Sequence, residues 1–469
     1  MPGSSPDCAI LASLRARAAE LTLAGTALER GRERSLPHSP HTAAWCASPE
    51  VGGAASLIPK ISTSAGASVN PSAIYLDVSN TMNLTMPPTP RRAFECQCGR
   101  PVFFRNDVCL HCKTPLGYDP ERVLLRPLEA AEAPDSWRAM PVAGDDAGVP
   151  LDVYRRCANH RTPAGCNWLV PIGESQTLCR GCRLVRTVPD VALAGNDSLW
   201  AKVEEAKRAV IAQLFALGLP VSSKVSEDIE RGVMFDLLRS TDGGPKVMTG
   251  HDDGLITLDV SEADDAYRES VRTRMREPYR TLIGHVRHEL GHYYWQRMVE
   301  HTEWEAPCRE LFGDDRLDYG DALKRYYDCG APQDWRDSYV SAYATAHPYE
   351  DWAETWAHYL HMIDAFGTAR SFGLSPTVAK LEFDPFPAEA LFSSGANPDE
   401  ADRQFMDMVN GWSELTVAFN QVTRSMGEPD FYPFVLSLPA VRKLHFIHRV
   451  ICAKQGRDLT NASAASQSH

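Results

Sequence analysis

The sequence of 469 residues lacks any run of about 18 or more consecutive apolar residues, so we expect no helix that crosses a membrane. Residues 1–30 also lack the uninterrupted apolar stretch of a secretory signal, because charged side chains such as Arg15, Arg17 and Glu20 interrupt them. Positive charge is in deficit, since 48 basic and 61 acidic side chains give a formal net charge of −13. This excess of negative charge argues against a nucleic-acid partner. Because a membrane helix and a secretory signal are both missing from the sequence pattern, we expect a cytoplasmic protein.

The overall composition is that of a folded protein, with 43% hydrophobic and 23% charged residues. At roughly 150 residues per domain, the length allows about three domains. Residues 1–90 are rich in Ala, Ser, Pro, Thr and Gly, and we predict a disordered leader with one short helix near 9–30. Residues 91–190 hold most of the cysteines, 195–453 have the apolar periodicity of a globular domain, and 454–469 form a polar tail that we expect to be disordered.

The periodicity within 195–453 places the main secondary-structure elements. A helix is predicted to start at Asn196 and to stop at Gly218, and the alternating segment 254–260 is predicted to be a strand. Further helices are expected near 268–300, 349–366 and 399–425. This order predicts an α+β fold, with a small mixed sheet over a mostly helical body.

Eight of the thirteen cysteines form two groups of four, and each group ends in a C-x-x-C pair. In a chain without a secretory signal, such pairs indicate bound metal rather than disulfides. The first group has two pairs about ten residues apart, the arrangement that a tetrahedral four-thiolate zinc site requires. Its predicted ligands are Cys96, Cys98, Cys109 and Cys112.

The second group opens with an unusually wide pair, and its predicted ligands are Cys157, Cys166, Cys179 and Cys182. His160 is an alternative to Cys157 as the first ligand. A site closed by four thiolates has no open position for a substrate, so we expect one or two structural zinc ions that stabilise these ribbons. Aromatic and basic residues lie between the cysteines, and such residues could bind a protein partner at the ribbons.

The string "HELGH" carries the chemistry of the larger domain. On a helix, His288 and His292 lie one turn apart on the same face and can hold one zinc ion, while Glu289 can reach a water on that ion. Tyr293, Tyr294 and Trp295 follow the motif, and three consecutive aromatic residues favour a buried helix over a solvated one. His285, one turn before His288, is expected to support the site rather than to bind metal.

A catalytic zinc site needs a third protein ligand. The metzincin pattern would have a histidine at position 298, and Met298 excludes that subclass. The segment "SAYATAHPYEDWAETWAHYLH" offers Glu350 at the start of a predicted helix and Glu354 one turn further on. One residue of this helix is expected to ligate and others to orient the ligands. The acidic stretch 313–321 is a competing source of a carboxylate.

These motifs resemble a known family. The strings "GHVRHELGHYYW" and "YATAHPYEDWAETWAHYLH", preceded by two cysteine groups, are similar to the zinc-binding metallopeptidase family with an N-terminal zinc ribbon, over residues 92–453. The second string also resembles the helix of gluzincin toxins, in which a tyrosine lies seven residues before a glutamate ligand. The resemblance implies Glu350 as the third ligand and Tyr343 as the donor to the oxyanion. Asp351 departs from the aromatic residue of that pattern, and Asp351 and Glu354 are expected beside the ligands.

Motif and resemblance together imply a zincin-like, zinc-dependent peptidase with a peptide or protein substrate. Glu289 would be the general base for a metal-activated water. The strand at 255–260 is expected to be the edge along which an extended peptide adds by backbone hydrogen bonds. The alternative is a zinc-ribbon scaffold protein whose zincin-like domain is inert, although the intact Glu289 argues against it.

Overall fold

The computed structural model describes residues 91–142, 152–240, 246–374, 384–392 and 397–466. Contacts between Cα atoms divide the chain into Met1–Leu84 and Thr85–His469, and every described residue belongs to the second unit. The predicted leader and its helix near 9–30 lie outside the described residues. No helix among the described residues is long and apolar enough to cross a membrane.

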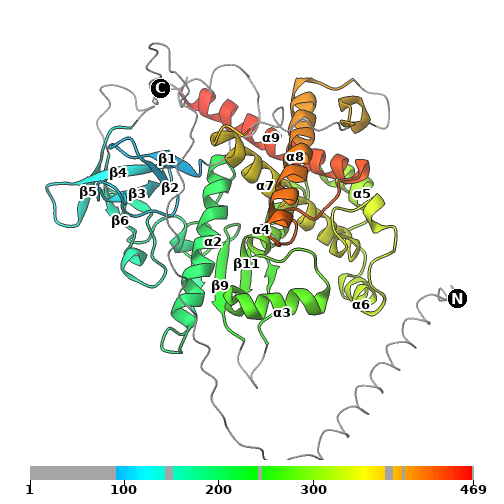
Figure 1. The fold of residues 1–469 in the computed structure, drawn as a ribbon, viewed down its shortest axis with the longest axis horizontal. Helices are drawn as coiled ribbons and strands as arrows, with labels where there is room; N and C mark the ends of the chain where they lie inside the picture. Colours follow the sequence, from blue (N-terminus) through cyan, green and yellow to red (C-terminus); the bar gives the residue numbers. More distant parts are fainter. Residues whose placement is uncertain (1–90, 143–151, 241–245, 375–383, 393–396, 467–469) are drawn as a thin grey trace, which may run out of the picture. The chain divides into compact units, whose positions relative to one another are not determined.

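The cysteine-rich region contains two antiparallel sheets (Figure 1). The first pairs β1 (Ala93–Glu95) with β2 (Pro101–Phe103). The second has five strands in chain order: β3 (Leu116–Asp119), β4 (Leu124–Ala130), β5 (Ser136–Ala139), β6 (Val153–Arg156) and β7 (Leu169–Pro171). No strand of this five-stranded sheet was predicted from the sequence, in which bound zinc was the only stabilising feature expected for the region. Strands of three to seven residues are too short for an apolar period to stand out.

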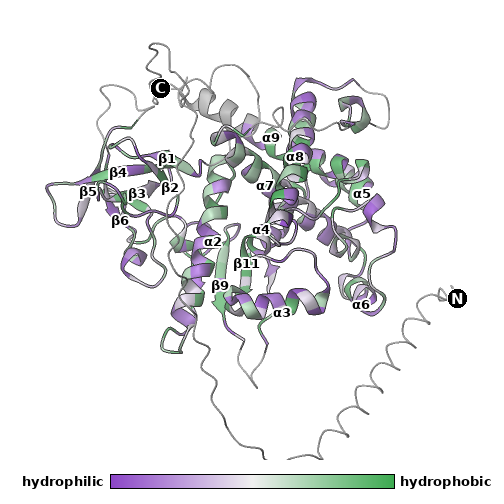
Figure 2. Ribbon diagram, in the orientation of Figure 1, coloured by the Kyte–Doolittle hydropathy of each residue, from purple (hydrophilic) through white to green (hydrophobic). Residues whose placement is uncertain are grey.

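The larger domain has the predicted α+β architecture, with a mixed four-stranded sheet beside a helical body. The strand order is β10–β11–β9–β8, in which only β10 and β11 pair antiparallel. Strands β9 and β11 are hydrophobic (Figure 2) and bury their side chains among the helices. The strands are β8 (Val185–Thr187), β9 (Met234–Leu238), β10 (Gly250–Asp252) and β11 (Leu255–Asp259).

The helices cover most of the larger domain, and their bounds agree with the predicted segments near 349–366 and 399–425. They are α2 (Asn196–Ala216), α3 (Asp265–Met275), α4 (Leu282–Met298), α5 (Glu305–Phe312), α6 (Tyr319–Cys329), α7 (Pro348–Ser371), α8 (Glu400–Ser425) and α9 (Leu438–Ser466).

Helices α4 and α7 pack closely in the centre of the domain. The backbone of Gly291 on α4 lies against Ala353 on α7, so that a Cβ atom at Gly291 would be 3.0 Å from the Ala353 Cα. The indole Nε1 of Trp352 donates a hydrogen bond of 2.9 Å to the carbonyl oxygen of Gly291. Tyr294 stacks on Trp356, with ring centroids 4.9 Å apart. Together these three contacts fix the spacing between the two helices that carry the predicted metal ligands.

Helix α2 contacts both the cysteine-rich region and the larger domain. Phe215 near its C-terminal end packs against Trp168, with ring centroids 6.0 Å apart. Gln213 donates to the carbonyl oxygen of Leu360 on α7 (2.8 Å) and accepts from the guanidinium of Arg287 on α4 (2.8 Å). The two regions therefore share one continuous hydrophobic core.

Three details differ from the sequence-based expectations. The helix expected near 268–300 is two helices, because Arg276 is left-handed (φ 57°), Pro278 follows, and Thr281 caps the N-terminus of α4. The expectation that 255–260 forms a sheet edge is wrong, since β11 lies between β10 and β9, and β10 is the edge. The last helix, α9, continues to Ser466 and so includes most of the segment 454–469, for which a disordered tail was expected.

Candidate metal centre and catalytic cavity

The predicted ligands come together across the contact between α4 and α7. His288 Nε2 lies 3.0 Å from Glu350 Oε2, and His292 Nε2 lies 3.6 Å from Glu350 Oε1. One ligand atom from each of the three residues lies within 4.8 Å of the others. Two imidazoles and one carboxylate form the donor set that zinc takes in catalytic sites with an open fourth position.

The burial and charge of these three residues also suit a bound metal ion. Glu350 Oε2 is buried, and its contact with His288 Nε2 at 3.0 Å is not oriented as a hydrogen bond, so this oxygen is not satisfied among the described residues, which a protein tolerates rarely. Burial raises the pKa of Glu350, but His292 and His288 outweigh this and hold it well below its usual range. Burial lowers the pKa of His288, but its close contacts with the Glu350 and Glu354 carboxylates raise it well above its usual range. The carboxylate and the imidazoles thus form one electrostatic unit that a cation can occupy.

Glu354 contacts the outer nitrogen of the first histidine. His288 Nδ1 lies 2.7 Å from Glu354 Oε1, and the hydroxyl of Ser341 donates to Glu354 Oε2 at 2.6 Å. A carboxylate in this position fixes the ring orientation and leaves Nε2 available for metal. The structure therefore brings Glu354 beside the metal ligand set, where the sequence analysis expected it.

Of two other residues that were expected near the ligands, Asp351 pairs elsewhere, and His285 stays outside the metal-ligand group, as expected. Asp351 accepts a hydrogen bond of 2.6 Å from Lys443 Nζ, so it joins α7 to α9 and does not face the histidines. Burial raises the pKa of Asp351 to about 7, and Lys443 opposes this. His285 is outside the metal-ligand group, and burial, with Arg280 nearby, lowers its pKa to about 3.

The sequence analysis missed Tyr319, at the start of α6. Its hydroxyl donates to Glu350 Oε1 at 2.5 Å. Tyr319 lies in the stretch 313–321 that was considered as a source of a metal-binding carboxylate, but the metal-ligand group contains no carboxylate from this stretch. No sequence pattern points to such a role for a tyrosine at the start of a helix, because the contact depends on how the start of α6 lies against α7.

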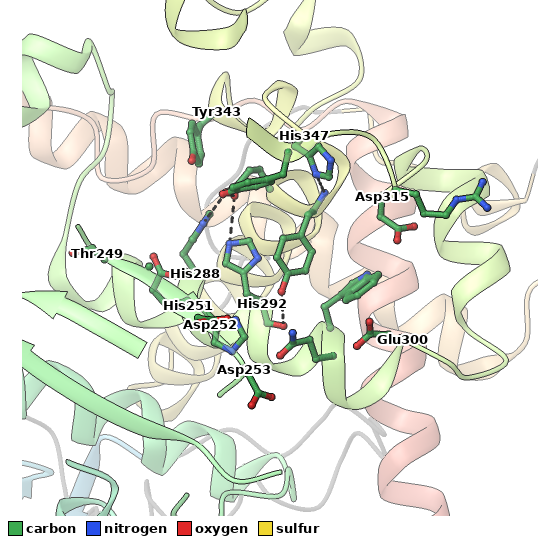
Figure 3. A pocket seen from close by; sticks show the side chains of 18 residues that line it. Thr249, His251, Asp252, Asp253, His288, His292, Glu300, Asp315, Tyr343 and His347 are labelled. Atoms are coloured by element: carbon green, nitrogen blue, oxygen red, sulfur yellow. Dashed lines mark hydrogen bonds and ion pairs between the residues drawn. The ribbon is translucent and has the colours of Figure 1, made fainter. Parts of the chain in front are cut away.

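A cavity of about 650 Å³ opens onto the predicted metal ligands (Figure 3). Glu289 lines it, and burial raises the pKa of this carboxylate, although His288 and His292 oppose the shift. Tyr343 also lines it, with its ring centroid 6.0 Å from that of His288. Burial raises the pKa of Tyr343 well above its usual range, so its hydroxyl keeps its proton.

His251 is a second cavity residue that the sequence analysis missed. It lies on the edge strand β10, and its ring stacks on that of His292 with centroids 6.2 Å apart. The backbone N–H of Gly254 donates to its Nε2 at 2.9 Å. Burial, with His292 nearby, lowers the pKa of His251 to about 3, so the ring is neutral. His251 thus packs beside a metal ligand without joining the metal-ligand group.

The first cysteine group also brings its four sulfur atoms together. The Sγ atoms of Cys96 and Cys112 are 3.6 Å apart, and those of Cys98 and Cys109 are 3.8 Å apart. All four lie within 4.8 Å of one another. Cys96 and Cys109 are buried, whereas Cys98 and Cys112 are exposed at the surface.

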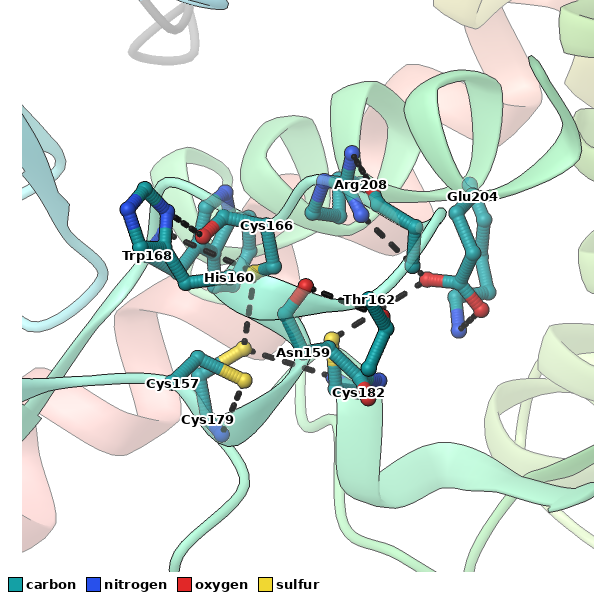
Figure 4. A network of polar contacts seen from close by, with 12 residues as sticks. Cys157, Asn159, His160, Thr162, Cys166, Trp168, Cys179, Cys182, Glu204 and Arg208 are labelled. Atoms are coloured by element: carbon teal, nitrogen blue, oxygen red, sulfur yellow. Dashed lines mark hydrogen bonds and ion pairs between the residues drawn. The ribbon is translucent and has the colours of Figure 1, made fainter. Parts of the chain in front are cut away.

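The second cysteine group is buried throughout and packs against α2 (Figure 4). Its four sulfur atoms, from Cys157, Cys166, Cys179 and Cys182, likewise lie within 4.8 Å of one another. The alternative ligand His160 is not among them, since its Nδ1 lies 3.1 Å from the carbonyl oxygen of Cys166. On α2, Glu204 Oε2 approaches Cys182 Sγ at 4.0 Å, and Arg208 donates to the carbonyl oxygen of Ala164 at 2.9 Å.

The site and the fold define a class: an α+β protein with a zinc-ribbon region and a zinc-binding peptidase-like domain. The family described as "putative zinc-binding metallo-peptidase" matches residues 196–450, and a zinc-ribbon domain matches residues 93–193. The chain belongs to this metallopeptidase family. The zinc-ribbon match covers both cysteine groups, which indicates zinc as their metal.

Two curated relatives are similar over most of their length. Uncharacterized proteins of Mycobacterium bovis and Mycobacterium tuberculosis are each 41% identical to this chain over 362 residues. The alignments cover 77% of this chain and 95% of each relative. No solved structure matches the chain.

Proposed function

We propose that the chain is a zinc-dependent peptidase that hydrolyses peptide bonds with Glu289 as the general base. One observation carries the proposal: the ligand atoms of His288, His292 and Glu350 meet in a cavity that Glu289 also lines. This is the constellation that hydrolysis by a metal-activated water requires. The two cysteine groups are proposed to hold two further, structural zinc ions.

His288, His292 and Glu350 would hold the catalytic zinc. When bound, zinc supplies a Lewis acid and lowers the pKa of a water to about 7. Glu354 holds the ring of His288 by the hydrogen bond to Nδ1, and Tyr319 holds the carboxylate of Glu350. The contact of Glu354 leaves Nε2 of His288 free to face the metal, and the contact of Tyr319 orients the Glu350 carboxylate.

The remaining groups of the cavity would act on the peptide. Glu289 accepts the proton of the attacking water and passes it to the leaving amine. Tyr343 keeps its proton and donates a hydrogen bond to the carbonyl oxygen as it gains negative charge. The edge strand β10 lines the same cavity, and its free edge can pair with an extended peptide. Edge strand, base and ligands together suit a peptide bond as the reacting group.

The test is Glu289→Gln, which keeps the size of the side chain and removes the base. We expect the zinc content to stay at the wild-type value while hydrolysis of a casein-type substrate falls by about 10²–10⁴-fold. Tyr343→Phe should keep zinc too and lose roughly 10²–10³-fold, as for one missing oxyanion donor. A zinc chelator added to the wild type is the control for contaminating proteases.

If the zincin-like domain is instead an inert scaffold, any activity of the preparation should not depend on Glu289. If activity persists unchanged in Glu289→Gln, it comes from another source, and the ribbon-bearing scaffold becomes the better account. Peptide cleavage that is lost in both variants, with zinc retained in both, supports the peptidase.

A further inference from the structure

The cavity is lined by more carboxylates than the proposed base and metal ligand account for. Besides Glu289 and Glu350, four carboxylates and a single arginine line it: Asp252, Asp253, Glu300, Asp315 and Arg316. The cavity is a candidate ligand site independently of these charges, because the ligand atoms of His288, His292 and Glu350 lie within 4.8 Å of one another on its wall. The added carboxylates therefore lie where a bound molecule would contact them.

Part of this charge is neutralised within the protein. Arg309 pairs with Asp315 at 2.6 Å, and Lys224 pairs with Asp253 at 3.1 Å. The arginine of the cavity, Arg316, is itself paired with Asp314 at 2.7 Å, outside the cavity lining.

Two cavity carboxylates remain without a partner. Across the described part of the chain, neither Asp252 nor Glu300 has a side-chain hydrogen bond or an ion pair. Their charge is therefore left for a ligand to neutralise.

Both carboxylates belong to elements that also build the metal site. Asp252 ends the edge strand β10, where the positive φ angles of Asp253 (42°) and Gly254 (77°) form the tight turn into β11. Glu300 follows α4, and its backbone N–H donates to the carbonyl oxygen of Trp295 at 3.0 Å. Figure 3 shows Asp252 beside the histidines, with Glu300 further along the cavity wall.

Aromatic side chains complete this part of the wall. Trp295 and Tyr349 both line the cavity and pack edge to face, with ring centroids 5.2 Å apart. Aromatic rings can hold the aliphatic stem of lysine or the guanidinium plane of arginine while the charged head reaches a carboxylate. The net charge of −13 on the whole chain also repels acidic peptides and attracts basic ones.

We infer that the cavity selects peptides with a lysine or arginine side chain close to the scissile bond, and that Asp252 and Glu300 determine this selectivity. The inference rests on the proposed peptidase function and names its substrate class. The two carboxylates contact the side chain of the substrate and take no part in bond breaking.

The experiment compares cleavage of a positional-scanning fluorogenic peptide library by the zinc-loaded full-length protein and its variants. At one position near the cleaved bond, we expect lysine and arginine to exceed glutamate. Asp252→Asn and Glu300→Gln should each lower this ratio about two- to fivefold, the usual value of one exposed ion pair. Salt at 1 M, where the Debye length is about 3 Å, should also lower it.

Glu310→Gln is the matched control, because Glu310 is exposed on α5 outside the cavity and its loss changes the net charge equally. It should leave the ratio unchanged. A cleaved library without basic preference, or a preference that survives both cavity substitutions, overturns the inference and leaves the peptidase function intact.

A binding measurement distinguishes failure of the proposed peptidase function from failure of the inferred charge selectivity. Two labelled dodecapeptides that differ only by lysine or glutamate at the selected positions are titrated with Glu289→Gln by fluorescence polarisation. If the library is not cleaved but the lysine peptide binds more tightly, and this depends on Asp252 and Glu300, the peptidase function fails and charge selection stands. Equal binding of the two peptides overturns the inference.

Discussion

Gly291→Ala is the substitution that tests most directly whether the packing of α4 on α7 sets the metal site. The added Cβ would lie 3.0 Å from the Cα of Ala353, 3.3 Å from its carbonyl oxygen and 3.2 Å from Cδ1 of Trp356. Two of these neighbours are backbone atoms, which cannot rotate away. The two helices must therefore move apart by some tenths of an ångström.

Two effects of opposite sign act on stability. Alanine is favoured over glycine inside a helix by about 1 kcal/mol. Overpacking a close contact typically costs about 1–3 kcal/mol. We therefore expect the free energy of unfolding to fall by about 0–2 kcal/mol, a change that urea denaturation can detect. The larger effect should be on metal, because the movement separates His288 and His292 on α4 from Glu350 on α7. By analogy with the loss of a group that orients a ligand, we expect zinc affinity at this site to fall about 10–100-fold.

The assay is zinc retention against graded concentrations of a competing chelator, read by metal analysis. Gly284→Ala is the control on the same helix, because an added Cβ there meets only side-chain atoms, the nearest being Thr281 Oγ1 at 3.1 Å. It should gain helix propensity and keep wild-type zinc affinity. Equal zinc affinity in the two variants would refute the view that this backbone contact positions the ligands.

Three further predictions concern the proposed zinc sites. Glu350→Ala should lose the zinc of the cavity, whereas Glu354→Ala should keep it with about 10–100-fold weaker affinity, as for a lost hydrogen bond to a ligand; the reverse order in metal analysis would make Glu354 the ligand. The three ligand groups predict close to three zinc ions per chain, and Cys109→Ser with Cys112→Ser should remove one of them. Because Cys98 and Cys112 are exposed while the second group is fully buried, a chelator time course should release the first ribbon's zinc before the second; simultaneous release would contradict this.

Local patterns predicted much of the candidate site. The spacing of His288 and His292 on one helix face required only the helical period, and both cysteine groups could be seen as pairs along the chain. The predicted helix after Pro348 made Glu350 and Glu354 candidates, and the resemblance singled out Glu350 as the ligand.

Residues from separate elements were beyond the reach of these patterns. Tyr319 and His251 reach the cavity only because α6 and β10 pack there, and neither belongs to a motif. Asp351 was expected near the ligands, but the buried Lys443 on a helix far along the sequence pairs with it instead. The place of β11 in the middle of its sheet depends on pairing with β9 and β10, which a single strand pattern does not specify.

Arg92 lies just before the first strand of the ribbon, and its guanidinium forms a two-pronged contact with Asp364 on α7, at 2.8 and 3.0 Å. Asp364 also accepts from Arg287, the residue next to His288, at 2.6 Å. The ribbon is thus fastened to the helix pair that carries the metal ligands, in addition to the core that it shares through α2. A shortened chain that begins after the ribbon would leave Arg287 and Asp364 without this cation and would expose the ribbon-facing side of α2. We therefore expect the smallest stably folded form of the chain to include its zinc ribbon.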